Sequence, residues 1–206
     1  MLRSKLLQTS LVAVAVTCAG SGGYADDSSA RSDEFTARLN GFNELGALNN
    51  QTGAVLSNGT GTVTLHLHQT SIDYTLSYSD VGTTGPKTGT VSQAHIHFGK
   101  SRDSGGVIVF FCGTTATPGP AGTPTCPPHT GTVTGTWTAA SVVGPASQNI
   151  APGNFDGLVA ALTSNTAYAN IHTTSSPTPP APDTAFPAGE IRGQCHSEDR
   201  EHQENR

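Results

Sequence analysis

Apolar and polar residues alternate one by one within many short segments of this chain, and turn-forming residues separate these segments. Positions 62–68 alternate threonine or histidine with aliphatic residues, in the order Thr62, Val63, Thr64, Leu65, His66, Leu67, His68. Because successive side chains of a strand point to opposite faces, this pattern predicts a strand with one buried face and one wet face. Further strands are predicted over 35–40, 72–78, 94–98, 107–111, 132–138, 169–173 and 189–195.

The composition agrees with short strands joined by turns rather than with a helical domain. Among the 206 residues are 24 glycines and 13 prolines, and charged residues make up only 12%. One helix is expected, because Phe155, Leu158 and Leu162 recur at helical spacing. Asn154 is a favourable N-cap for this helix, and Asn165 is suited to close it. The expected fold is all-β, an antiparallel sandwich or Greek-key barrel of about eight strands with one short helix.

The N-terminus has the features of an export signal. Arg3 and Lys5 precede a short apolar run over 11–16, which is far too short to span a bilayer. The mature protein is therefore expected to be secreted or periplasmic. Lipid attachment at Cys18 is the alternative, which the bulk of Thr17 disfavours because small residues usually precede a lipidated cysteine.

The remainder of the chain is predicted to hold a single domain. The expected segments are a signal peptide over 1–25, a linker over 26–32, the domain over 33–196 and a disordered polar tail over 197–206. Removing the signal takes away two of the 10 basic residues, and the remaining 8 against 15 acidic residues give a net charge of −7. This charge disfavours nucleic acid as a partner. No segment approaches the roughly 20 apolar residues of a transmembrane helix.

The four cysteines divide by position. Cys18 falls in the signal segment, whereas Cys112 and Cys126 bracket a loop rich in threonine, proline and glycine. Outside the cytoplasm this pair predicts a Cys112–Cys126 disulfide that clips the loop. The state of Cys195, which is left over near the C-terminus, is open.

Three histidines fall on matching faces of two predicted strands. His95 and His97 alternate with Ile96, and His172 follows Ile171. The isoleucines are expected to face the core, so the three imidazole rings are expected on the opposite surface, where they can converge. These histidines are candidate ligands for copper or zinc, because imidazole nitrogen suits both metals.

A second interpretation of the same histidines needs no metal. The rings would then bond to one another, to Glu190 and to loop backbone, and so pin the surface of the sheet. Glu190 and Arg192 flank Ile191 and are expected on the outer face. There Glu190 would accept a hydrogen bond from an imidazole N–H, or form an ordinary ion pair with Arg192. Asn170 is expected to be a hydrogen-bonding neighbour rather than a ligand.

Several motifs occur along the chain in a specific order. They are LNGFNE over 39–44, AHIH over 94–97, TVTGTW over 132–137, NIH over 170–172 and GEIRGQ over 189–194. Together they resemble the CHRD domain, the module named from chordin and found singly in bacterial secreted proteins. The resemblance implies a β-sandwich of immunoglobulin-like or Greek-key character and a poorly defined biochemical role. The chain departs from the common bacterial pattern in a long insertion between His172 and Gly189, beside the three histidines.

Two classes of function are open at this point. The first is a secreted, non-enzymatic binding module with an unknown protein or small-molecule partner, and the second is an extracytoplasmic copper or zinc protein. The AHIH strand resembles the copper strand of Cu/Zn superoxide dismutase, but only locally. No catalytic residue is predicted, because a nucleophile elbow, a phosphate-binding loop and an H-E-x-x-H motif are missing. A second histidine pair, His66 and His68, is interpreted as an exposed strand face.

Overall fold

The computed structural model describes residues 33–45, 53–174 and 185–198 of the chain. The predicted signal segment, the linker over 26–32 and residues 199–206 of the predicted tail lie outside the described residues. Ser197, the first residue of that tail, instead belongs to a strand and pairs with Phe35. The strands are β1 (Glu34–Asn40), β2 (Thr60–Leu67), β3 (Ile72–Ser79), β4 (Thr90–Phe98), β5 (Val107–Cys112), β6 (Gly131–Trp137), β7 (Ala167–Thr174), β8 (Ile191–Gln194) and β9 (His196–Ser197). Helix α1 spans Phe155–Thr163, and short 3-10 turns cover Gly41–Asn43, Ala139–Ser141 and Ala146–Gln148.

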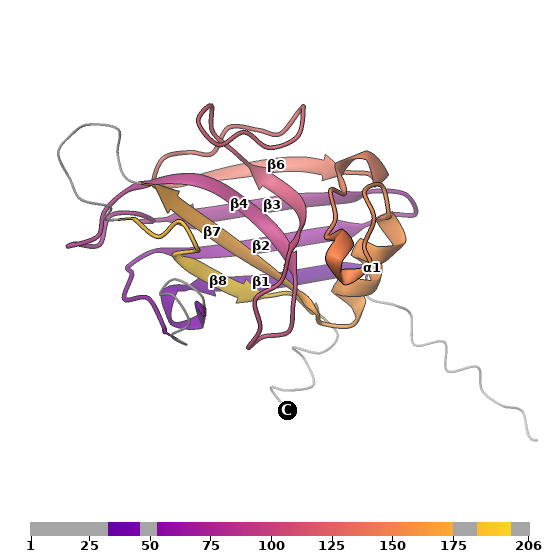
Figure 1. The fold of residues 1–206 in the computed structure, drawn as a ribbon, viewed down its shortest axis with the longest axis horizontal. Helices are drawn as coiled ribbons and strands as arrows, with labels where there is room; N and C mark the ends of the chain where they lie inside the picture. The colour runs from indigo at the N-terminus through magenta and orange to yellow at the C-terminus, as the bar shows by residue number, and fades with distance from the viewer. Residues whose placement is uncertain (1–32, 46–52, 175–184, 199–206) are drawn as a thin grey trace, which may run out of the picture. The chain divides into compact units, whose positions relative to one another are not determined.

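All strand pairs are antiparallel, and they form one sheet that folds over on itself. The order is β5-β4-β7-β8-β1-β2-β3-β6, and β9 pairs with β1. In Figure 1, β4, β7 and β8 cross in front of β1, β2 and β3, so the sheet forms two layers. The indole N–H of Trp137 in β6 donates to the Phe110 carbonyl of β5 at 2.8 Å, which links the two ends of the sheet. The expected all-β fold with one short helix is confirmed.

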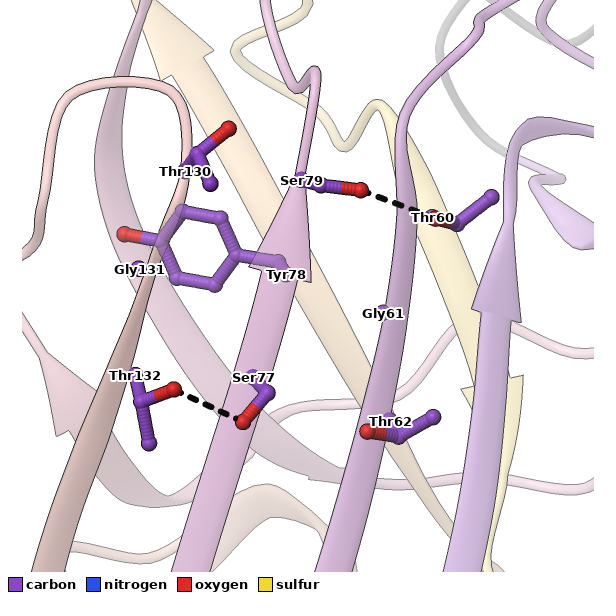
Figure 2. A pocket seen from close by; sticks show the side chains of 9 residues that line it. All are labelled: Thr60, Gly61, Thr62, Ser77, Tyr78, Ser79, Thr130, Gly131 and Thr132. Atoms are coloured by element: carbon purple, nitrogen blue, oxygen red, sulfur yellow. Dashed lines mark hydrogen bonds between the residues drawn. The ribbon is translucent and has the colours of Figure 1, made fainter.

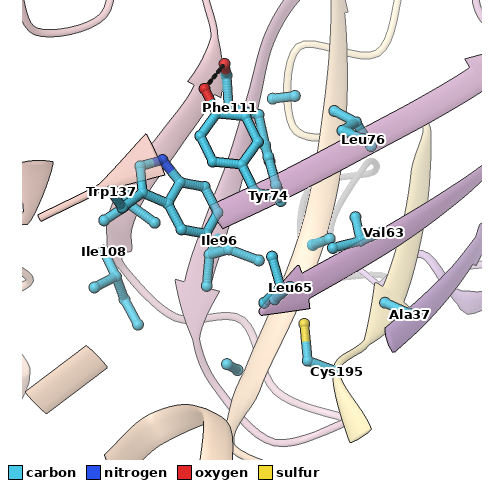
Figure 3. Close-up of a cluster of buried hydrophobic side chains, with 14 of the residues drawn as sticks. Ala37, Val63, Leu65, Tyr74, Leu76, Ile96, Ile108, Phe111, Trp137 and Cys195 are labelled. Atoms are coloured by element: carbon cyan, nitrogen blue, oxygen red, sulfur yellow. Dashed lines mark hydrogen bonds between the residues drawn. The ribbon is translucent and has the colours of Figure 1, made fainter. Parts of the chain in front are cut away.

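The hydrophobic core lies between the two layers. Figure 3 shows side chains from several strands meeting there, among them Ile96 and Trp137. Ile96 and Ile171 are fully buried, as the alternation predicted. The ring of Tyr74 stacks on Trp137 with 4.4 Å between centroids, and its hydroxyl donates to the Phe111 carbonyl at 3.1 Å. Each fully buried isoleucine stabilises the fold by roughly 1.5–3 kcal/mol relative to an exposed one.

The helix forms where helical spacing predicted it. The side-chain oxygen of Asn154 accepts a hydrogen bond from the Gly157 N–H at 2.9 Å and so caps the first turn. Leu158 and Leu162 are fully buried against the sheet layers, and Asn165 has a φ of 54°, the left-handed conformation that commonly follows a helix end. Within the described ranges, no helix combines the length and the apolarity that a membrane crossing needs.

The predicted disulfide is present. Cys112, the last residue of β5, is bonded to Cys126 and so closes the loop between β5 and β6. Cys195 is free and fully buried, and burial raises the pKa of its thiol to about 12. A buried thiol with so high a pKa is almost wholly protonated and therefore unreactive.

Candidate metal centre

Strands β4 and β7 lie side by side and carry the three candidate histidines. Their register pairs three positions on the outer face: His95 with Asn170, His97 with Tyr168, and Gln93 with His172. Ile96 and Ile171 point to the inner face, where both are fully buried. The structure therefore brings the three imidazole rings together on the outer face of one sheet layer.

The three rings are close enough to share one ion. One ring nitrogen of each histidine lies within 4.8 Å of the corresponding nitrogens of the other two. The ring centroids are 5.3 Å apart for His95 and His97, 4.9 Å for His95 and His172, and 5.7 Å for His97 and His172. The pairing of β4 with β5 shifts register between Ala94 and His95 and again between Ile96 and His97. Such bulges increase the local twist and re-aim side chains, so two histidines of one strand can turn toward a third.

The outer face that carries the histidines is covered, contrary to the expectation of a surface open to water. His95 is only 4% exposed and His97 8%, whereas His172 is half-buried. Phe110 of β5 packs edge-to-face on the His95 ring with 4.4 Å between centroids. The β4–β5 loop lies against His97, and the segment preceding β8 lies against His172. The rings are therefore buried between the outer face of this sheet layer and the segments that cover it.

Backbone carbonyls determine the protonation of two of the rings. His97 Nδ1 lies 3.0 Å from the Gly105 oxygen, and His172 Nδ1 lies 2.9 Å from the Pro187 oxygen. A carbonyl oxygen only accepts, so in each neutral ring Nδ1 carries the proton and Nε2 keeps its lone pair.

Four ring nitrogens of the three histidines have no hydrogen-bond partner within the described part of the chain. Nε2 of His97, Nε2 of His172 and both ring nitrogens of His95 are buried without a hydrogen-bond partner among the described residues. A buried polar atom left unsatisfied costs roughly 1–3 kcal/mol. One shared ion would satisfy one nitrogen of each ring, which is three of these four atoms.

All three imidazoles are held neutral by their surroundings. Burial lowers the pKa of His95 to about 2 and that of His97 to about 4, and repulsion from His172 adds to both shifts. Burial also lowers the pKa of His172. Neutral imidazole is the form that coordinates metals, so binding at neutral pH need not first displace a proton from these side chains.

Arg192, predicted to neighbour the histidines, reaches them through an aromatic ring. The Tyr168 and His97 rings are parallel within 5°, with 4.9 Å between centroids. The guanidinium carbon of Arg192 lies 3.4 Å from the centroid of Tyr168. The same guanidinium donates to the carbonyls of Lys100 and Asp103 at 2.9 and 2.8 Å, which ties the β4–β5 loop to the sheet. Arg192 is only 2% exposed, so its charge is offset by the ring and these carbonyls rather than by water.

Glu190 is directed away from the histidines, in contrast to its expected role as an acceptor for an imidazole N–H. Three donors satisfy its buried carboxylate: Ser57 Oγ at 2.7 Å, the Gly82 N–H at 2.9 Å and Thr173 Oγ1 at 3.0 Å. Gly189 has a φ of 131°, and β8 begins only at Ile191. The strand alternation that would place Glu190 on the same face as Arg192 therefore does not extend to residue 190.

Asn170 bonds to a buried carboxylate, that of Glu44, which the sequence did not indicate as part of the site. Its amide Nδ2 donates to Glu44 Oε2 at 2.6 Å and to the Ile191 carbonyl at 2.9 Å. Glu44 is only 4% exposed, and its negative charge acts on His172, where it opposes the effect of burial on the pKa. Glu44 closes the LNGFNE motif, but no spacing rule connects it with a residue 126 positions away.

The second histidine pair lies outside this centre. His66 and His68 are both exposed, with His66 Nδ1 3.7 Å from the Glu34 carboxylate and His68 Nε2 3.0 Å from the Asp73 carboxylate. Their interpretation as an exposed strand face is confirmed. They provide matched controls for experiments on the buried histidines.

A shallow hollow on the other sheet layer has different chemistry. Figure 2 shows this hollow over β2, β3 and the start of β6, where threonine, serine and glycine surround Tyr78. Its hydroxyls bond to one another, Thr60 with Ser79 at 3.2 Å and Ser77 with Thr132 at 2.9 Å. Its lining has no imidazole, thiol or carboxylate, so the histidine cluster is the better candidate for a metal.

Comparison with family models identifies the family that the motifs resemble, over a range that ends before the GEIRGQ motif. A family model of the CHRD domain matches residues 35–179, a range that includes all three candidate histidines. Neither the curated proteins nor the solved structures gave a match.

Proposed function

The chain belongs to the CHRD domain family, and we propose that this member is a binding module that holds one transition-metal ion on His95, His97 and His172. The proposal combines the two functions that the sequence left open, because the metal is held by the module itself. Two kinds of residue take part: the histidines as ligands, and the groups that orient their rings.

The unpartnered ring nitrogens carry this proposal. A purely structural network would pair these nitrogens with neighbouring groups, and the acceptor expected for that role, Glu190, bonds elsewhere. The Nδ1 bonds of His97 and His172 to backbone carbonyls are those that metal-binding imidazoles usually make on the side away from the ion. One ion among the three rings accounts for the Nδ1 bonds and for three of the four unpartnered nitrogens, and it leaves the second nitrogen of His95 without a partner among the described residues.

Copper or zinc fits this set of ligands best. The cluster consists of three imidazoles without a thiolate or a carboxylate, a combination that suits both metals. The affinity order of divalent metals favours copper wherever both are available. A bound cation would accept one nitrogen lone pair from each of the three imidazoles.

Because the cluster is buried, we infer that it holds a metal ion and does not catalyse a reaction. A catalytic metal needs a coordination position that its substrate can reach. Three imidazoles leave one position free on copper or zinc, so the burial of the rings, rather than the number of ligands, is what disfavours catalysis. His95 and His97 are almost inaccessible, so exchange is expected from the side of the half-buried His172. We therefore propose storage, delivery or stabilisation as the role of the metal.

The same proposal places the protein outside the cytoplasm, either secreted or periplasmic. The Cys112–Cys126 disulfide supports this location, because such bonds persist in oxidising compartments. The export-signal pattern of the N-terminal residues supports it as well.

Titration of the purified full-length protein with Cu(II) and Zn(II) tests the proposal. We expect one ion per chain, and we expect His172→Ala to weaken binding by at least about 100-fold, more than the roughly 10–100-fold typical of partners around a site. The double variant His95→Ala/His97→Ala should abolish binding. His172→Ala remains informative if the double variant does not fold, because His172 is the least buried of the three.

The exposed pair supplies the control for this titration. His66→Ala/His68→Ala also removes two imidazoles but leaves the buried cluster intact, so its affinity should equal that of the wild type. Wild-type affinity in folded His172→Ala, or loss of binding in the control, would contradict the proposal.

A further inference from the structure

A second hollow, which Arg192 helps to line, concentrates positive charge. Its volume is about 520 Å³, and its lining includes Arg38, Arg102, Arg192 and His196 but no acidic residue. This concentration occurs in a chain whose formal net charge is −5. All three arginines within the described part of the chain lie around this one hollow.

The cations enter the hollow from three separate elements. Arg192 on β8 is buried and held in place by the Lys100 and Asp103 carbonyls. Arg38 is an exposed residue of β1, and Arg102 is exposed in the β4–β5 loop. The hollow is therefore lined by one buried arginine that is held in place and by two exposed ones.

Two of the three arginines have no acidic partner among the described residues. The charges of Glu44 and Asp103 act on Arg192. In contrast, Arg38 and Arg102 form no ion pair with any residue in the described ranges. Like charges around one concavity repel one another, and an anion that enters it relieves this repulsion.

We propose that this hollow, defined here as the arginine pocket, binds a small organic anion with two or more oxyanion groups. A guanidinium matches carboxylate and phosphate geometry with two parallel hydrogen bonds, so the two exposed ones, Arg38 and Arg102, favour an anion with two such groups. The volume falls within the roughly 300–1,000 Å³ of small-molecule sites. Phe42, which is 67% exposed, and Leu45 line the same pocket and offer contact to the carbon skeleton of such a ligand.

The arginine pocket and the proposed metal ligands have no residue in common. None of the three candidate metal-binding histidines lines it. Arg192 is nevertheless common to both regions, because it stacks on Tyr168, which stacks on His97. Anion binding can therefore be tested without added metal, and its failure would leave the metal proposal untouched.

Calorimetric titration of the full-length protein with phthalate, benzoate and inorganic phosphate, at one fixed ionic strength and without added metal, tests the proposal. Phthalate carries two carboxylates on an apolar ring, benzoate carries one, and phosphate has no carbon skeleton. We expect phthalate to bind one to one and at least tenfold more tightly than either of the others. The double variant Arg38→Gln/Arg102→Gln should weaken phthalate binding at least tenfold.

Lys87→Gln is the matched control, since it removes a cation that lies outside the arginine pocket. It should bind phthalate as the wild type does, and so should His172→Ala. Absence of phthalate binding, equal affinity for benzoate, or equal weakening by Lys87→Gln would overturn the proposal. Tighter binding of phosphate than of phthalate would also overturn it, because the apolar rim would then have no role.

Discussion

Tyr168 and His97 hold the same loop residue from two sides. The Gly105 N–H donates to the Tyr168 hydroxyl oxygen at 3.1 Å, and the Gly105 carbonyl accepts from His97 Nδ1 at 3.0 Å. The two rings also stack, and their positions are directly opposite in the register of β4 and β7. The orientation of His97 is therefore coupled to the β4–β5 loop through its cross-strand neighbour.

Replacing Tyr168 with phenylalanine should loosen the β4–β5 loop without removing the ring stack. We expect the free energy of unfolding to fall by about 1 kcal/mol, the usual net value of one hydrogen bond. Metal affinity should fall less than in His172→Ala, because all three ligands remain. Denaturant unfolding and metal titration of Tyr168→Phe measure both effects, and a loss of affinity as large as that of His172→Ala would contradict the assigned role.

Glu44 is expected to support metal binding by its charge. Glu44→Gln preserves a side chain of similar shape beside Asn170 but removes the negative charge that acts on His172. A cation bound by three neutral ligands should then be held less tightly, with an affinity loss of about 10-fold. Titration with Zn(II) measures the loss, and unchanged affinity in a folded variant would show that this charge does not reach the ion.

The assignment of inner and outer faces can be tested with a buried charge. Ile171→Asp would place an unpaired carboxylate in the apolar core and should destabilise the domain by about 4 kcal/mol or more. The exposed Thr75 on β3 provides the control, because Thr75→Asp adds the same charge in water. Circular dichroism during thermal unfolding distinguishes them, and equal melting temperatures would mean that the faces are assigned wrongly.

The disulfide is expected to stabilise one loop more than the sheet. Cys112→Ser/Cys126→Ser removes a cross-link between residues 14 positions apart, which costs about 3 kcal/mol on the chain-entropy model. Hydrogen exchange should speed up most within 113–125.

Cys195 should resist alkylation in the folded protein, since it is fully buried. Rapid labelling of Cys195 without denaturant would contradict this placement.

Acid should destabilise the domain through the buried histidines. Their pKa values lie below the ordinary value of 6.5, at about 4 for His97 and about 2 for His95. As pH falls below 6.5, the unfolded chain takes up protons that the folded chain does not, so stability is complete above 6.5 and is lost toward pH 4. The expected slope is about 1.4 kcal/mol per pH unit for each such histidine.

Denaturant unfolding at several pH values between 7 and 4 measures this slope. His66→Gln/His68→Gln should retain it, because both replaced residues are exposed. His97→Gln should show a smaller slope than the wild type. A free energy of unfolding that stays constant from pH 6.5 to 5 would mean that the rings are protonated as readily in the folded state as in the unfolded state.

Most of the fold and the three candidate ligands could be predicted, because they depend on patterns within single strands. His95 and His97 share a face for the same local reason that Ile96 is buried between them. Glu190 was misplaced because the prediction extended strand alternation through Gly189, whose positive φ interrupts it. The disulfide could be predicted because its two cysteines enclose one loop.

The parts that could not be predicted depend on contacts between distant segments. Nothing in the alternation distinguishes an outer face that meets water from one that a loop covers, so the burial of His95 and His97 came only from the tertiary structure. Glu44 lies beside the cluster because β1 and β7 are both neighbours of β8 in the sheet. Arg38, Arg102 and Arg192 meet for a similar reason, since β1, β8 and the β4–β5 loop converge there.

Local pattern thus decided which side chains share a face, because a strand's period of two is a property of the backbone and needs no partner. Tertiary structure decided what covers each face. It converted a row of polar residues into a desolvated cluster in which imidazoles stay neutral and their nitrogens lack partners. Desolvation depends on every segment packed around a group, and for that reason it could not be inferred from any one strand.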